Sequence, residues 1–176
     1  DEKSPARISG RVPDVPPSVI LLFPGQGSQR PGMARTLYDA DTTSAELIDR
    51  ACAMVSRLSG PDDLRDLLLS ASQNADDSER LARTGRTQPA LFIFEYALAD
   101  YLVRRGVSPA ALAGHSIGEY VAACLAGVMS FDDALRLVVL RGRLMASTEP
   151  GAMYGVSMVA ADMADLQAVF GPEMSI

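Results

Sequence analysis

Hydrophobic and polar positions follow two kinds of pattern along this chain: short continuous apolar runs, and longer stretches with helical spacing. The run VILLF at 19–23 ends at Pro24 and Gly25 and is typical of a buried strand in a parallel sheet. The run ALAGHS at 111–116 predicts a second buried strand that leads into a turn, and AMYGVSMV at 152–159 predicts a third.

Helical spacing of apolar residues predicts six helices, at 44–58, 62–70, 87–106, 117–127, 130–147 and 162–171. Pro89 falls in the first turn of the long third helix and Gly106 ends it, while Ser130 is a candidate cap for the fifth. The segment ASQNADDSER at 71–80 is predicted to be a polar surface connection. Strands that alternate with helices indicate an α/β fold with a parallel sheet.

The composition of the chain limits the classes of protein to which it can belong. The chain has 176 residues, 48% hydrophobic and 22% charged, which is typical of one globular domain. Its net charge of −6 disfavours nucleic acid and anionic membranes as partners. With one histidine and only Cys52 and Cys124, both in apolar helical patterns, we expect neither a disulfide framework nor a metal site. No apolar run reaches the roughly 20 residues that span a bilayer, and no secretion signal begins the chain, so we expect a cytoplasmic protein.

The motif GHSIG lies where the second strand would turn into a helix, and this context is typical of a nucleophile elbow that exposes Ser116. Gly114 and Gly118 would let the strand and the helix approach closely. The backbone N–H of Ile117 could then face a developing oxyanion at the helix start. The alternative is that the serine is only a polar residue in a turn. The adjacent His115 is not assumed to be its base, because neighbours in a strand point to opposite faces.

The loop PGQGSQ at 24–29 follows the first strand, and its glycines would let backbone N–H groups approach a ligand oxygen. It lacks the GK[ST] of a P-loop, so a phosphate site is the weaker interpretation, and a plain turn is the alternative.

Arg141 has an unusual position on its predicted helix. Four apolar residues lie within about 60° of it around the helix axis: Leu137, Val138, Leu144 and Met145. Arg136 and Arg143 fall on the opposite side, so two arginines are predicted to face water and one the core. A guanidinium stays charged when buried, so Arg141 requires an anionic partner. That partner is either a ligand carboxylate or an internal one, from Glu95 or Glu119.

Four motifs, FPGQGSQ, TQPALF, GHSIGEYVAA and RGRLM, occur in this order. From about Val19 to its end the chain resembles the amino-terminal half of malonyl-CoA:acyl carrier protein transacylases and polyketide synthase acyltransferase domains. The resemblance implies a hydrolase-like parallel sheet with flanking helices as a large subdomain, and an inserted ferredoxin-like small subdomain. We expect the large subdomain at 19–150 and the start of the small one at 151–176. The proline-rich segment 1–18 would be an interdomain linker or extension.

The resemblance also implies roles for individual residues. Ser116 would be the acylated nucleophile, and the backbone N–H groups of Gln26 and Ile117 would form the oxyanion hole. Arg141 would bind the free carboxylate of a malonyl-type unit, in a pocket lined by Gln88. The implied reaction passes malonyl from coenzyme A to the serine and then to the phosphopantetheine thiol of an acyl carrier protein. Ile117 also resembles the residue of malonyl-selecting domains. No tightly bound cofactor is implied.

The implied partners are the acyl carrier protein, malonyl-CoA, neighbouring synthase domains and the remaining half of the acyltransferase domain. In this family the general base is a histidine of the carboxy-terminal half, and this sequence has none there. His115 would instead pack beside the substrate site. We therefore expect an incomplete domain that exposes strand edges and a cut core. The alternatives are a serine esterase or thioesterase, and a non-catalytic fragment that retains contacts with the carrier protein.

Overall fold

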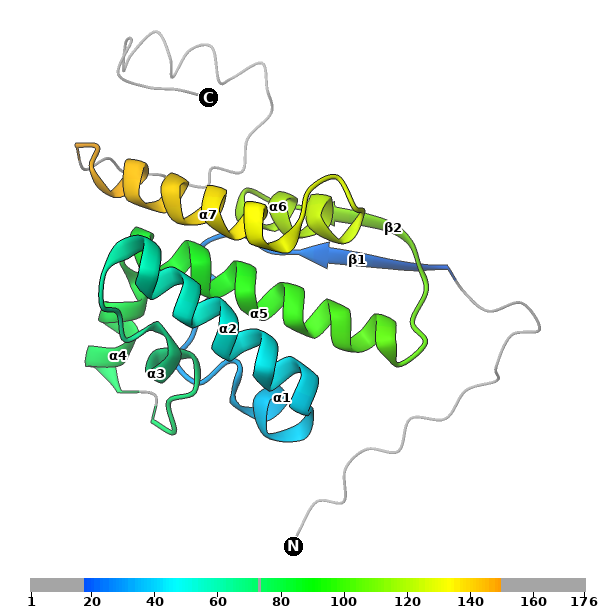
Figure 1. Ribbon diagram of the computed structural model, residues 1–176, viewed down its shortest axis with the longest axis horizontal. Helices are drawn as coiled ribbons and strands as arrows, with labels where there is room; N and C mark the ends of the chain where they lie inside the picture. The colour runs from blue at the N-terminus through cyan, green and yellow to red at the C-terminus, as the bar shows by residue number, and fades with distance from the viewer. Residues whose placement is uncertain (1–17, 73, 150–176) are drawn as a thin grey trace, which may run out of the picture.

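The computed structural model describes residues 18–72 and 74–149, in which two parallel strands are flanked by seven helices (Figure 1). The strands are β1 (Val19–Phe23) and β2 (Pro109–Gly114). The helices are α1 (Arg35–Ala40), α2 (Thr42–Ser59), α3 (Leu64–Leu68), α4 (Ala75–Ala82), α5 (Thr84–Arg104), α6 (Ile117–Leu125) and α7 (Phe131–Ala146). The predicted α/β class with a parallel sheet is confirmed. The segments at 1–17 and 150–176, with the linker, strand, helix and small subdomain predicted there, lie outside the described residues.

The two strands pair in parallel, with Leu21 opposite Leu112 and Phe23 opposite Gly114. Successive side chains of β1 point to opposite faces of the sheet. Phe23 is buried in the core, whereas Leu22 is 73% exposed and Ile20 is also exposed. The prediction that β1 is a buried strand is therefore wrong for most of its residues within the described structure, because no described element covers its outer face. The prediction that β2 is buried is wrong there for the same reason, since none of its residues is fully buried.

Helix α5 lies in the middle of the molecule, between α2 and α7, and also packs against α6 (Figure 1). Its near-continuous apolar sequence fits burial on most sides, and Phe92 and Ile93 are fully buried. The helix begins at Thr84, three residues earlier than the sequence pattern predicted, so Pro89 lies in its second turn.

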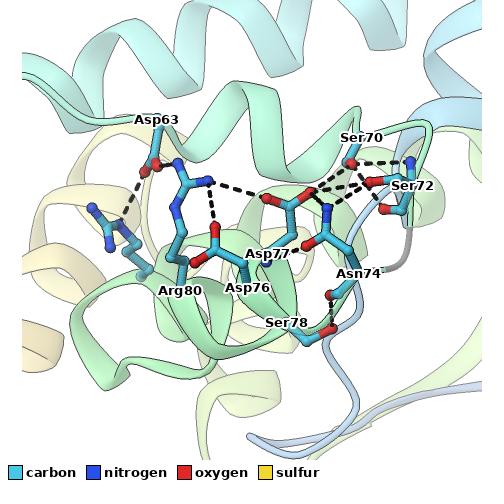
Figure 2. A network of polar contacts seen from close by, with 9 residues as sticks. Asp63, Ser70, Ser72, Asn74, Asp76, Asp77, Ser78 and Arg80 are labelled. Carbon is cyan, nitrogen blue, oxygen red and sulfur yellow. Dashed lines mark hydrogen bonds and ion pairs between the residues drawn. The ribbon is translucent and has the colours of Figure 1, made fainter.

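Helix α4 was missed by the sequence analysis, which predicted a polar connection there. Asn74 caps this helix by accepting a hydrogen bond from the Asp77 N–H at 2.7 Å, and two acidic residues occupy its first turn. Only Leu81 of α4 is buried, so the apolar signal was too weak to predict it. Figure 2 shows that Arg80 of α4 contacts Asp63, at the start of α3, as well as carboxylates of its own helix.

The two helices that follow the motif GHSIG form close to their predicted positions. Helix α7 begins after Ser130, whose hydroxyl accepts a hydrogen bond from the Asp133 N–H at 3.1 Å. Helix α6 ends at Leu125, two residues before the predicted end, and Gly127 follows with a φ of 76°. Within the described residues, no helix is long and apolar enough to cross a membrane.

Glu95 is an ionisable residue in the apolar interior. Its side chain extends from α5 into the lining of a cavity of about 280 Å³, which β1 also lines through Leu21 and Phe23. The residue is 7% exposed, and neither carboxylate oxygen has a hydrogen-bond partner within the described part of the chain. Burial raises the pKa of Glu95 from its ordinary value of 4.5 to about 8. The carboxyl group is therefore largely protonated in the folded chain at neutral pH.

This shift predicts that the folded chain loses stability as the pH rises. Between about pH 4.5 and pH 8 the unfolded state releases the Glu95 proton while the folded state retains it, so the free energy of unfolding falls across this interval. Glu95→Gln removes the titration, so we expect it to raise the melting temperature more at pH 9 than at pH 5. Thermal unfolding followed by circular dichroism measures the difference. The exposed Glu79→Gln is the matched control, and an equal pH dependence in wild type and Glu95→Gln would contradict the prediction.

Candidate active site

Ser116 occupies a sharp turn between the end of β2 and the start of α6. Its φ of 54° and ψ of −111° make it the one non-glycine residue with positive φ in the described ranges. Such a backbone conformation is strained and persists only where the surrounding structure maintains it. The His115 N–H donates to the Phe23 carbonyl at 2.9 Å, and the Gly118 N–H donates to the His115 carbonyl at 3.0 Å. The predicted sequence of strand, sharp turn and helix is confirmed.

The two glycines of the motif allow this geometry because neither position has room for a side chain. A Cβ atom on Gly114 would overlap the backbone of Gly118 and Glu119. A Cβ atom on Gly118 would overlap the backbone of Phe23. The close approach of β2, α6 and β1 at this point therefore depends on glycine at both positions.

The loop after β1 lies against the elbow. A Cβ atom on Gly25 would lie only 2.5 Å from the His115 Nδ1 atom and 3.1 Å from its carbonyl oxygen. The loop is ordered by its own hydrogen bonds, from the Ser28 hydroxyl to the Gly25 carbonyl and from the Gly27 N–H to Gln29 Oε1. The loop is thus an ordered turn whose Gly25 lies directly against the residue before Ser116.

The two N–H groups assigned to the oxyanion hole belong to Gln26, which follows Gly25, and to Ile117, which follows Ser116. Ile117 is the first residue of α6, where backbone N–H groups have no acceptor within the helix. Across the described ranges neither its N–H nor that of Gln26 has a protein acceptor. The side chain of Gln26 reaches α5, where its Nε2 lies 3.4 Å from Thr84 Oγ1. Both N–H groups are therefore without a protein acceptor in the described structure, one next to Ser116 in sequence and the other next to Gly25, which lies against His115.

His115 is exposed, and its ring lies beside Gly25. No hydrogen bond joins this ring to the Ser116 hydroxyl in the described structure. His115 therefore lies beside the loop after β1 and makes no hydrogen bond to the serine oxygen in the described structure.

Arg141 approaches Ser116 directly. Its Nη2 atom donates to Ser116 Oγ at 3.3 Å, and its guanidinium lies 5.7 Å from the ring centroid of Tyr120. No carboxylate lies within ion-pair distance of it among the described residues, so the predicted salt bridge to Glu95 or Glu119 is not found there. The internal-salt-bridge alternative is wrong for this part of the chain.

The surroundings of Arg141 differ from those predicted by helical spacing. Only Val138 of its four apolar neighbours is buried, while Leu137, Leu144 and Met145 are exposed. This helix face is therefore partly open instead of facing the core, because no described element covers it. Arg136 and Arg143 are exposed, as predicted.

Gln88 lies where α5 contacts α7 and is 1% exposed. Its Nε2 lies 3.1 Å from Met145 Sδ, while its Oε1 is buried and has no partner within the described residues. A Cβ atom added to Gly142, the residue after Arg141, would lie 3.7 Å from the Cβ atom of Gln88. The amide therefore lies against the part of α7 that carries the guanidinium, and its free oxygen can accept a hydrogen bond.

Other nucleophiles and metal ligands do not compete with Ser116 in the described ranges. Cys52 and Cys124 are both buried and free, and burial raises their thiol pKa values to about 12 and about 11. Both thiols are therefore protonated at neutral pH. No cluster of histidine, cysteine, aspartate and glutamate there could hold a metal ion.

Tyr120 is the residue beside the site that the sequence analysis missed. It follows Ser116 by four positions, which places it about one helical turn further along α6. This spacing was a usable signal, but the approach of α7 over α6 was needed to show that Arg141 meets its ring.

Comparison with known proteins agrees with this geometry. The family described as acyl transferase domain matches residues 20–172. Over 140 residues the chain is 43% identical to a component of the phenolphthiocerol/phthiocerol polyketide synthase of Mycobacterium tuberculosis, covering 80% of this chain and 9% of that protein.

Solved structures give the same result. The acyltransferase domain from the second module of the salinomycin polyketide synthase is 45% identical with a TM-score of 0.68, covering 81% of this chain and 32% of that one. A malonyl-transacylase in complex with its type II polyketide synthase acyl-carrier protein is 37% identical with a TM-score of 0.62, covering 76% and 40%. The chain thus spans a small part of the curated relative and between 32% and 40% of these two solved chains.

Proposed function

This chain belongs to the acyl transferase domain family, as its four motifs predicted, and on that premise we propose that it moves a malonyl-type acyl group from coenzyme A to an acyl carrier protein through Ser116. The observation that carries the proposal is the contact of 3.3 Å between the Arg141 guanidinium and Ser116 Oγ, with no carboxylate paired to that guanidinium in the described residues. A positive charge next to a nucleophile suits an acyl group with a carboxylate of its own.

The reaction would have two steps, acylation of Ser116 and transfer of the acyl group from Ser116 to the carrier protein. Ser116 Oγ attacks the thioester carbonyl carbon and gives up its proton, and the resulting oxyanion accepts hydrogen bonds from the N–H groups of Ile117 and Gln26. The C–S bond then breaks, coenzyme A leaves with a proton, and an acyl-serine ester remains. The phosphopantetheine thiol of the carrier protein attacks this ester and reverses the steps. Neither step requires a tightly bound cofactor.

The proton of Ser116 needs an acceptor that the described residues do not supply at hydrogen-bond distance. Arg141 is the group within that distance of Ser116 Oγ in the described structure, and a guanidinium only donates. We therefore assign the general base to the carboxy-terminal histidine that the family resemblance implies. The remaining half of the acyltransferase domain is accordingly one of the proposed partners, with the carrier protein and neighbouring synthase domains.

The malonyl assignment rests on two features. Arg141 provides a charge for the free carboxylate, and Ile117 resembles the residue of malonyl-selecting domains. The side chain of Ile117 is fully buried, so its role would be exerted through the backbone and the packing of the elbow. An esterase using the same elbow has no need of an arginine at this place, which favours the transferase.

A transfer assay tests the proposal in an acyltransferase domain that contains this chain in full. The domain is incubated with labelled malonyl-CoA, and the protein is digested and analysed by mass spectrometry before and after addition of carrier protein. We expect a malonyl ester on Ser116 that moves to the carrier thiol. Release of free malonate at the same rate with and without carrier protein would favour the hydrolase. In a parallel assay of this chain alone, binding of carrier protein without any label would favour the non-catalytic fragment.

A further inference from the structure

An aromatic ring, instead of an acidic side chain, lies against the arginine of the candidate active site. The Arg141 guanidinium lies over the Tyr120 ring at 5.7 Å from its centroid, within the range of a cation–π contact. Tyr120 is half-buried on α6, and Arg141 reaches it from α7. Ser116 Oγ is the other group that contacts this guanidinium in the described structure.

Two other arginines of the chain also lie over tyrosine rings but have different charged neighbours. Arg65 lies over Tyr38 and Arg104 over Tyr101, at 5.4 and 5.9 Å from the ring centroids. Each of them is also paired with a carboxylate, at 2.6 Å in both cases. In these two cases the carboxylate neutralises the charge and occupies part of the N–H fork.

Arg141 differs from these two because its aromatic contact stands without such an acid in the described residues. Arg105, which lies 4.7 Å from the centroid of the Tyr101 ring, also has no ion pair there, but it is an exposed residue just after α5. A ring face attracts the cation but accepts none of the hydrogen bonds that the guanidinium edge can donate to a carboxylate. The charge and the fork thus stay available beside Ser116.

We propose that Tyr120 is a positioning residue for the acyl-transfer reaction: its ring holds Arg141 next to Ser116 without neutralising it. The inference rests on the proposed function, because it assigns to Tyr120 the support of the group that would bind the malonyl carboxylate. The inference predicts that Tyr120 affects the transfer of acyl groups that carry a carboxylate. Acetyl transfer has no such group and should not depend on the ring.

Two substitutions separate the ring from the hydroxyl. In the complete domain, Tyr120→Leu removes the aromatic face and keeps an apolar side chain, whereas Tyr120→Phe keeps the face. We expect Tyr120→Leu to lower kcat/KM for malonyl-CoA by about tenfold, mainly by raising KM. Its acetyl-CoA kinetics should change by less than about twofold, and Tyr120→Phe should resemble wild type with both substrates.

Tyr101→Leu is the matched control, because it removes a ring from beneath Arg104 and Arg105 near the end of α5. It should leave both substrates unaffected. Melting temperatures report folding, and Tyr120→Met provides a second ring-free variant if Tyr120→Leu does not fold. Equal losses with malonyl-CoA and acetyl-CoA, or a Tyr120→Phe variant as impaired as Tyr120→Leu, would overturn the inference. A wild-type domain that acylates Ser116 with neither substrate would instead overturn the proposed function.

Discussion

Replacement of Ser116 by alanine is expected to lower acyl transfer by about 10⁴- to 10⁶-fold, because it removes the oxygen that would carry the acyl group. Alanine retains the Cβ atom and so retains the backbone strain at φ 54°, and the Arg141 side chain loses only one weak hydrogen bond. The fold should therefore survive the substitution. Incubation with labelled malonyl-CoA followed by mass spectrometry measures the result directly.

Ser116→Gly is the companion variant for this experiment. It should be as inactive as Ser116→Ala, yet it should melt at a higher temperature, because glycine adopts a positive φ without steric cost. Together the two variants separate the chemistry of the side chain from the conformation of the turn. Label that persists in Ser116→Ala would show that another residue is acylated.

Replacement of Arg141 by alanine is expected to reduce malonyl transfer by about 10²-fold and acetyl transfer by less than about threefold. The difference arises because only the malonyl group has a carboxylate to pair with the guanidinium. Arg141→Lys should fall between the two, since an ammonium keeps the charge but lacks the planar fork. Initial rates with the two coenzyme A thioesters, compared in one domain preparation, measure the ratio.

Arg136→Ala serves as the control for that comparison. Arg136 lies on the same helix, is exposed and has no ion-pair partner in the described residues. Its loss should leave both rates near those of wild type. If Arg141→Ala lowered malonyl and acetyl transfer equally, its role would be structural, and the carboxylate assignment would fail.

Local signals in the sequence were sufficient for much of the candidate site. The pattern of small residues around Ser116 predicted the turn because the close approach of strands and helix excludes any Cβ atom at Gly114 and Gly118. The period of α7 predicted that Arg136 and Arg143 face water, and both are exposed. These inferences depend on a few neighbouring residues, so they hold without knowledge of the whole fold.

Inferences that depend on distant contacts were less complete. Helical period alone could not predict that Leu144 is exposed, because exposure depends on which elements cover that face of α7. The contact between Arg141 and Tyr120 required the packing of α7 on α6. Helix α4 has one buried residue, Leu81, so its capping residue Asn74 was the stronger signal, in a segment predicted to be a polar surface connection.

The exclusion of side chains from the elbow has a consequence for engineering of substrate range. Positions 114 and 118 admit only glycine, so the proposed acyl site cannot be reshaped from the elbow side without loss of the fold. Met145 of α7 is different, because it is exposed and its thioether sulfur lies 3.1 Å from Gln88 Nε2. Libraries that aim at bulkier or uncharged acyl groups should therefore vary α7 and the start of α5 and leave the strand-to-helix turn untouched.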